Sequence, residues 1–287
     1  MKFGLRYCNT GRYVDPRNAI ELARTAEECG FESLWTVEHT VVPAGYKSAY
    51  PYSNDGKMAG GVNDFPLPDP LVWLTYVAAV TSRIKLATGV FILPQHNPVV
   101  AAKQLASIDH LSGGRMLLGV GVGWLKEEFD ALGARFDERG ARTDEYIAAM
   151  RCLWRDDAPS FHGKFVRFDS AYCRPQPINR TIPIIVGGHS TAAAQRAGRL
   201  GDGFFPARGA SKELIDLVRR SAESAGRDPA CVEITATVPD DLADIARLTK
   251  LGVSRLLVPV VPMPGMNQGF HGTKDTTRWR DIVGAHA

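Results

Sequence analysis

The sequence predicts an α/β fold, a single (β/α)8 TIM barrel. Short β-branched runs alternate with longer amphipathic segments along the chain, which indicates βα units and a parallel sheet. The alternation gives eight strand–helix pairs, the number of a closed barrel, and 287 residues suit one barrel of roughly 250 residues with insertions. The G-x-G-x-x-G motif that usually follows the first strand of an open doubly wound sheet is missing, and no boundary divides residues 1–287 into two domains.

In the first half of the chain, a capping residue followed by proline marks where helices begin. Asp15-Pro16, Asp69-Pro70 and Asn97-Pro98 each place an N-cap before a proline at the first helical position. A fourth helix carries apolar residues on one face, namely Tyr146, Ile147, Met150, Leu153 and Trp154. The strands predicted between these helices cover residues 2–7, 33–37, 84–93 and 115–122.

The second half repeats the alternation. Its strands are predicted at residues 182–186, 203–206, 231–238 and 254–260. Its helices are predicted at residues 190–199, 211–225 and 240–251, with a last helix around Trp279 and Ile282. Three segments interrupt the rhythm, namely residues 40–68, a hairpin-like excursion at 157–181, and residues 261–273. Because loops of this length are usually functional lids or disordered, we expect them to be insertions at the face that carries the site.

Composition excludes several classes of function. With 34 basic and 31 acidic residues the formal net charge is +3, and no Lys/Arg run provides a stripe for nucleic acid. The five cysteines are scattered, which fits neither a disulfide framework nor a zinc site. The longest apolar stretch, around residues 71–80, is shorter than the ~18 residues needed to span a membrane, and the start of the chain lacks the apolar core of a signal peptide. We therefore expect a cytoplasmic protein without a metal.

Active sites of such barrels lie at the carboxyl ends of the strands, where three hypotheses arise. Gly187-Gly188-His189-Ser190 leads into a helix, so free N–H groups and the helix dipole favour a phosphate; a tight turn with a serine N-cap is the alternative. His39 follows the second strand and is either a proton carrier or cofactor contact, or a structural histidine bonded to a carbonyl. Gly119, Gly121 and Gly123 either let a flat ring lie against the backbone or simply make the strand flexible.

Seven segments, in order along the chain, carry a family resemblance. They are Thr36-Val37-Glu38-His39, Ala87-Thr88-Gly89-Val90-Phe91-Ile92-Leu93-Pro94, Asn97-Pro98, Leu111-Ser112-Gly113-Gly114-Arg115, Gly119-Val120-Gly121-Val122-Gly123-Trp124, Pro183-Ile184-Ile185-Val186-Gly187-Gly188-His189-Ser190 and Gly201-Asp202-Gly203. Together they resemble the luciferase-like monooxygenases, and within them the branch that uses the deazaflavin coenzyme F420. The ordered set is specific and covers most of the chain.

The resemblance implies a luciferase-like barrel with the F420 ring over the ends of strands two to four, and with His39 as the catalytic residue near the reactive carbon of the ring. It also implies a bulge after strand three, often with a cis peptide bond between non-proline residues, which maps to Gly89-Val90 and would support the ring from behind. The expected cofactor-binding residues are Asn9, His39, Thr88, Gly89, Val90, Val122, Gly123, Glu127, Gly187, Gly188, His189, Ser190 and Pro206.

Two departures from the family pattern matter. Luciferases that use FMN have an arginine for its phosphate where this chain has Val122, which weakens the FMN interpretation. Sugar-phosphate dehydrogenases of the F420 branch carry an acid where this chain has Trp124, so their substrate and proton donor are not transferred to this chain. Glu127 and Glu128, early in the following helical region, are candidate replacements for that acid.

Three functions remain as hypotheses. The favoured one is an F420-dependent oxidoreductase that transfers a hydride between the deazaflavin and a small organic substrate, with His39 handling a proton. The second is an FMN-dependent monooxygenase that receives reduced flavin from a separate reductase and uses oxygen. The third is a protein that binds flavin or deazaflavin without turnover. The family resemblance and the base rate for oligomers both favour a homodimer.

Overall fold

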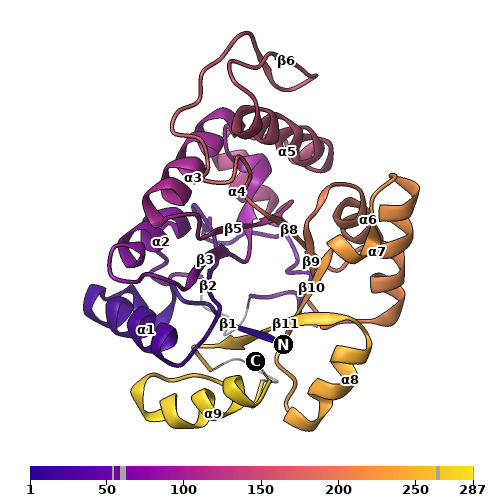
Figure 1. The fold of residues 1–287 in the computed structure, drawn as a ribbon. Helices are drawn as coiled ribbons and strands as arrows, with labels where there is room; N and C mark the ends of the chain where they lie inside the picture. Colours follow the sequence, from indigo (N-terminus) through magenta and orange to yellow (C-terminus); the bar gives the residue numbers. More distant parts are fainter. Residues whose placement is uncertain (54, 59–62, 263–265, 287) are drawn as a thin grey trace.

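The computed structural model of the chain describes residues 1–53, 55–58, 63–262 and 266–286. Eight parallel strands form a closed ring, because β1 pairs with both β2 and β11 while β3 pairs with β5 (Figure 1). In order around the ring they are β1 (Lys2–Arg6), β2 (Ser33–Thr36), β3 (Lys85–Thr88), β5 (Met116–Gly121), β8 (Ile184–Gly187), β9 (Gly203–Phe205), β10 (Glu233–Thr237) and β11 (Val253–Pro259). The predicted barrel is confirmed.

Helices surround this ring (Figure 1). They are α1 (Pro16–Glu28), α2 (Pro70–Ala78), α3 (Pro98–Ser112), α4 (Lys126–Ala131), α5 (Arg139–Arg155), α6 (Thr191–Leu200), α7 (Lys212–Ser224), α8 (Ile245–Lys250) and α9 (Thr276–His286). Asp15, Asp69 and Asn97 each accept hydrogen bonds from two N–H groups of the helix they cap, and a proline follows each of them. Three of the predicted helix starts are thereby confirmed down to the capping atoms.

The predicted third strand is divided in two. β3 ends at Thr88, a cis peptide bond joins Gly89 to Val90, and β4 (Phe91–Ile92) then continues along β5. The bulge expected after strand three is therefore present, and so is its cis bond. The first strand also ends one residue earlier than predicted, because Tyr7 adopts a left-handed backbone with φ 66°.

Two helical segments differ from the prediction. The short α4 lies between β5 and α5, where the sequence pattern gave a single helix. The helix predicted at residues 240–251 begins only at Ile245, because Asp241 accepts a hydrogen bond from the N–H of Ala243 and caps a 3-10 turn first. The hairpin-like excursion is confirmed as a pair of antiparallel strands, β6 (Phe161–His162) and β7 (Arg167–Phe168).

The barrel interior holds a small apolar cluster of its own. Its members are Trp35, Ala87, Leu117, Ile185, Phe205 and Leu257. The indole of Trp35 is accommodated because β1 and β5 carry glycines at the points of closest approach: a Cβ on Gly4 would lie 2.9 Å from the Trp35 ring, and one on Gly119 would lie 1.8 Å from the Thr88 carbonyl oxygen. Gly119 is thus required by strand packing rather than by a bound ring. Trp35, Trp73 and Trp154 are all buried core residues, as their spacing predicts.

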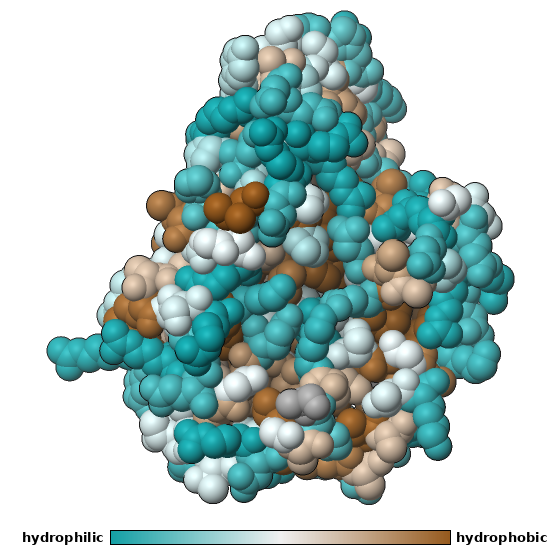
Figure 2. Space-filling view, in the orientation of Figure 1, coloured by the Kyte–Doolittle hydropathy of each residue, from teal (hydrophilic) through white to brown (hydrophobic). Residues whose placement is uncertain are grey.

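One flank of the molecule exposes large apolar side chains. Brown side chains over α2 and α3 are among the hydrophobic areas of the face that Figure 2 shows. Val72 is 66% exposed, Val100 54% and Leu111 80%. A shallow depression between the two helices includes Val72, Tyr76 and Leu111 in its lining. Within the residues that the structure describes, no helix combines the length and the apolar character needed to cross a membrane.

Candidate active site

The side chain of His39, just after β2, is held by a glutamate from α4. Its Nδ1 lies 2.9 Å from Oε2 of Glu128, a residue with no exposed surface. The other oxygen of Glu128 accepts hydrogen bonds from the N–H groups of Thr40 (2.6 Å) and Val41 (3.3 Å). Since Glu128 acts as an acceptor in all three contacts, Nδ1 of His39 carries the donated proton and Nε2 is left for a ligand. This partner of His39 escaped sequence reasoning, because 89 residues separate the two positions.

Glu127, the preceding residue, anchors a different part of the same loop. Its carboxylate accepts hydrogen bonds from the hydroxyl of Ser48 (2.7 Å) and from the N–H groups of Lys47 and Ser48 (2.7 and 3.2 Å). The Ser48 hydroxyl and these backbone donors lower the pKa of Glu127 to about 2. A carboxylate so engaged is a poor proton donor near neutral pH. The structure therefore gives Glu127 a loop-anchoring position rather than a free place beside a cofactor.

Trp124 lies in a cluster of aromatic rings over the end of β5. The centroid of its ring is 5.9 Å from that of His39, 5.5 Å from Tyr46 and 5.1 Å from Tyr50, all edge to face. Burial raises the pKa of the Tyr50 phenol to about 12. The loop after β2 thus brings two tyrosines onto the residue that departs from the family pattern, and it makes an aromatic wall beside His39.

Val90, the residue after the cis bond, fits between the ends of β5 and β8. A Cβ added to Gly121 or to Gly187 would come within 2.4 Å of its methyl groups. Glycine at both positions therefore makes room for Val90. Thr88 points elsewhere: it is buried, and its hydroxyl donates to the carbonyl of Gly119 at 2.7 Å.

A second histidine–glutamate pair, of residues not predicted to be in the site, supports the bend at Gly89–Val90 between β3 and β4. Glu38 is buried and accepts a hydrogen bond from the N–H of Ile92, and its other oxygen lies 2.9 Å from Nε2 of His96. The imidazole of His96 stacks on Phe91 with ring centroids 4.0 Å apart. These contacts hold β4 against the end of β2 and so fix the backbone on both sides of Val90.

The predicted phosphate segment does precede a helix. Gly188 has φ 135° and its N–H donates to the carbonyl of Phe205, while the Ser190 hydroxyl caps α6 by accepting from the N–H of Ala193 at 3.2 Å. His189 accepts a hydrogen bond from the N–H of Arg208 at 3.3 Å, and burial together with the Arg208 charge lowers the pKa of His189. The serine N-cap is therefore present, and it leaves the first N–H groups of this ten-residue helix available to an anion.

The remaining predicted cofactor-binding residues lie at or near strand ends, and their contact with the cofactor stays a prediction. Asn9 is buried, donates to the carbonyls of Val37 and Pro68, and accepts from the N–H of Val37. Gly123 has φ 79°, and a Cβ there would collide with Phe129 and Ile92. The last two predicted positions lie at the ends of strands on either side of β8, with Val122 half-buried after β5 and Pro206 buried after β9.

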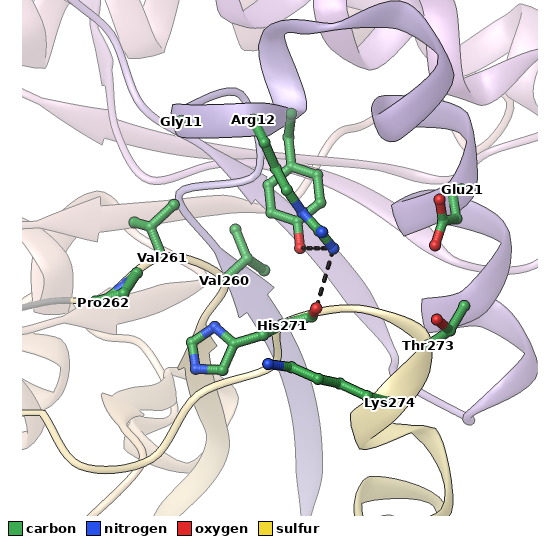
Figure 3. A pocket seen from close by; sticks show the side chains of 10 residues that line it. Gly11, Arg12, Glu21, Val260, Val261, Pro262, His271, Thr273 and Lys274 are labelled. Atoms are coloured by element: carbon green, nitrogen blue, oxygen red, sulfur yellow. Dashed lines mark hydrogen bonds between the residues drawn. The ribbon is translucent and has the colours of Figure 1, made fainter.

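A separate concavity of about 620 Å³ lies between the segments that follow β1 and β11 (Figure 3). Arg12, His271 and Lys274 are among its lining residues, with Glu21 on one side. The Arg12 guanidinium donates to the Tyr13 hydroxyl and to the His271 carbonyl, so its charge is held against the wall. The lining contains none of the residues predicted to bind the cofactor.

Known proteins resemble this chain over most of its length. The family described as luciferase-like monooxygenase matches residues 3–243. An uncharacterised protein of Mycobacterium tuberculosis is 35% identical over 263 residues, which cover 90% of this chain and 91% of the relative. The F420-dependent glucose-6-phosphate dehydrogenase of Amycolatopsis mediterranei is 32% identical over 243 residues, 81% of this chain and 67% of that enzyme.

Solved structures share the fold at lower identity. The monooxygenase RslO1 from Streptomyces bottropensis superposes with a TM-score of 0.75 at 23% identity, covering 100% of this chain and 99% of the other. The coenzyme F420-dependent tetrahydromethanopterin reductase from Methanopyrus kandleri gives a TM-score of 0.72 at 18% identity, with 99% and 97% covered. At these identities the likeness establishes the barrel architecture.

Proposed function

Because the chain belongs to the luciferase-like monooxygenase family, we propose that it is a coenzyme F420-dependent oxidoreductase acting on a small organic substrate. The observation that carries the proposal is that His39 and the Gly89–Val90 bend follow the ends of two paired strands, β2 and β3, with Nδ1 of His39 engaged by Glu128 and Nε2 left for a ligand. A proton carrier next to a surface where a flat ring can rest is the arrangement that hydride chemistry at such a ring requires.

The donors of the chain fit the coenzyme. Its phosphate would lie at the start of α6, on the backbone N–H groups of His189, Ser190 and the first turn of the helix, which lack partners within the helix. Its ring would rest against Val90, for which Gly121 and Gly187 leave room. When bound, F420 supplies or accepts a hydride at one carbon. His39 would then hold or move a proton at Nε2, and Trp124 and Tyr50 would keep water away.

Titration of the protein with oxidised F420 and, separately, with FMN tests the proposal, with the fluorescence of each cofactor as the signal. We expect saturable F420 binding at low micromolar concentration and much weaker FMN binding. Val122 predicts the weak FMN binding, since an aliphatic side chain gives no charge to a phosphate. A preference for FMN would overturn the cofactor assignment and direct the search to oxygen-consuming reactions fed by a reductase.

We also infer that two copies associate through the flank formed by α2 and α3. An apolar surface that includes side chains as exposed as Val72 and Leu111 is typical of an interface, and a twofold axis places the same patch on both partners. Light scattering on a sizing column should give a mass near twice 31.3 kDa. Leu111→Asp should shift it towards the monomer, whereas the matched substitution Leu132→Asp, at an exposed leucine outside this flank, should not.

A further inference from the structure

Arg6 places a positive charge inside the barrel, near its carboxyl end. It is the last residue of β1, and its Nη1 donates to the hydroxyl of Thr237 on β10 at 2.7 Å. Since β11 lies between β1 and β10 in the ring, this contact requires the side chain to cross the barrel interior. The Arg6 guanidinium carbon also lies 5.2 Å from the ring centroid of Phe205, a member of the interior cluster.

Within the described residues, this charge pairs with no acid. Arg6 is 9% exposed, and its hydrogen bonds go to the hydroxyls of Thr237 and Tyr7. Among the residues that the structure describes, no Asp or Glu oxygen lies within 4.0 Å of it. An enclosed charge without a counterion is costly. Two of its five N–H groups have acceptors here, which leaves donors for an anion.

The electrostatic effect of this charge extends to the aromatic side chains beside the proposed reaction site. The Tyr7 ring centroid is 4.3 Å from the Arg6 guanidinium carbon. Burial raises the pKa of Tyr50, and the charge of Arg6 acts in the opposite direction. Tyr50 packs on Trp124, and Trp124 packs on His39. The predicted phosphate segment follows β8, whereas Arg6 contacts the Thr237 hydroxyl on β10. The two anion sites therefore lie at different strands.

We propose that Arg6 binds the carboxylate of an organic-acid substrate and so orients the rest of the molecule along Tyr50 and Trp124 towards His39. The proposal names the substrate class of the oxidoreductase proposed above and rests on it. A carboxylate fits better than a phosphomonoester, because one guanidinium flanked by neutral hydroxyls matches a single negative charge. Arg208, the nearby second arginine, is exposed and donates to the carbonyl of Pro51.

The test measures binding of three probes to F420-saturated protein and to the protein alone by calorimetry. The probes are benzoate, its uncharged analogue benzamide, and phenyl phosphate. We expect benzoate to bind at least about tenfold more tightly than benzamide, since a charge-assisted bidentate contact is lost in the amide. Arg6→Met and Arg6→Gln should abolish this preference, Arg6→Lys should keep part of it, and the matched control Arg208→Met should keep all of it.

Equal binding of benzoate and benzamide to the wild-type protein would overturn the proposal, and so would a benzoate preference that survives in Arg6→Gln. An Arg6-dependent preference for phenyl phosphate over benzoate would overturn the carboxylate assignment. Circular dichroism verifies the fold of each variant, and the glutamine variant serves if the methionine variant does not fold. F420 affinity is measured in parallel and should change less than twofold in Arg6→Gln. If the wild-type protein does not bind F420 but prefers benzoate in an Arg6-dependent way, the cofactor assignment is refuted and the anion site is retained.

Discussion

The two ends of the barrel interior each hold an arginine, and the two arginines differ in their hydrogen-bond partners. Both donate to a threonine of β10: Arg255 to Thr235 near the amino end, and Arg6 to Thr237 near the carboxyl end. Arg255 is 1% exposed and also binds both oxygens of Glu32 at 3.0 and 3.1 Å, as well as Glu233 at 3.0 Å. Arg6 has only hydroxyls.

A single aromatic layer separates these two charges. The guanidinium carbon of Arg255 lies 5.7 Å from the centroid of the Trp35 ring, Trp35 packs on Phe205 at 5.9 Å, and Phe205 lies 5.2 Å from the guanidinium carbon of Arg6. The same residue type is therefore neutralised on one side of the layer and left available on the other. This matches the division of labour in such barrels, where one end provides stability and the other binds and reacts.

The largest effect should come from the carboxyl end. His39→Ala should lower turnover roughly 10²- to 10⁴-fold, because it removes the group that moves a proton. Turnover is followed by the absorbance of F420 with the best substrate from a panel of small organic acids. The melting temperature should stay close to that of the wild type, as should that of the control His110→Ala at an exposed position of α3. Full turnover in His39→Ala would remove the catalytic role.

At the amino end we expect a loss of stability instead. Arg255→Met should lower the free energy of unfolding by about 3 kcal/mol, because it leaves Glu32 without its cation and leaves Glu233 with Lys2 alone. Arg6→Met should lower it by less than about 1 kcal/mol, since it removes two bonds to neutral hydroxyls along with a poorly compensated charge. Urea titrations measure both. Equal losses of unfolding free energy in the two variants would show that both arginines serve the same structural purpose.

A smaller effect tests how the carboxyl end is organised. Glu128→Gln should lower kcat about tenfold, because the amide holds His39 less firmly in the required tautomer. The pH profile of kcat should shift while F420 affinity stays within twofold, a combination that general loosening of the fold would not produce. An unchanged profile would argue against the positioning role of Glu128.

The smallest effect concerns Glu127 and the loop that it anchors. Its pKa is lowered in the folded protein from an ordinary 4.5 to about 2, so its contribution to stability is complete above about pH 4.5 and is lost as the pH falls towards 2. Glu127→Gln should therefore melt about 2 °C below the wild type at pH 7. The gap should close between pH 4.5 and pH 2. A gap that widens on acidification would contradict this sign.

Much of this architecture is predictable because it depends on local signals. Capping residues followed by proline give the starts of α1, α2 and α3, and β-branched runs give the eight strands. The cis bond at Gly89-Val90 was accessible only through the family resemblance. His39 and the segment before α6 follow from the rule that sites lie at strand ends.

What sequence reasoning missed depends on contacts between distant segments. Nothing near Glu128 in the chain indicates that its partner is His39. The inward direction of Arg6 depends on the register of β1 against its neighbours, which the strand pattern alone does not give. Asn9 and Thr88, predicted to bind the cofactor, are buried and bonded to backbone, because short polar side chains at strand ends readily satisfy nearby backbone groups; their contact with the cofactor stays a prediction.

Two consecutive glutamates of α4 bind His39 and the loop that follows β2. Glu128 holds His39 and the backbone of residues 40–41, and Glu127 holds residues 47–48. The loop and the start of α4 therefore form one exchangeable unit. In a chimera that receives this loop from a relative but keeps its own residues 124–128, the loop would lack the glutamate contacts that anchor it. We expect transfer of both segments together to keep the anchor and to change substrate preference in a single step.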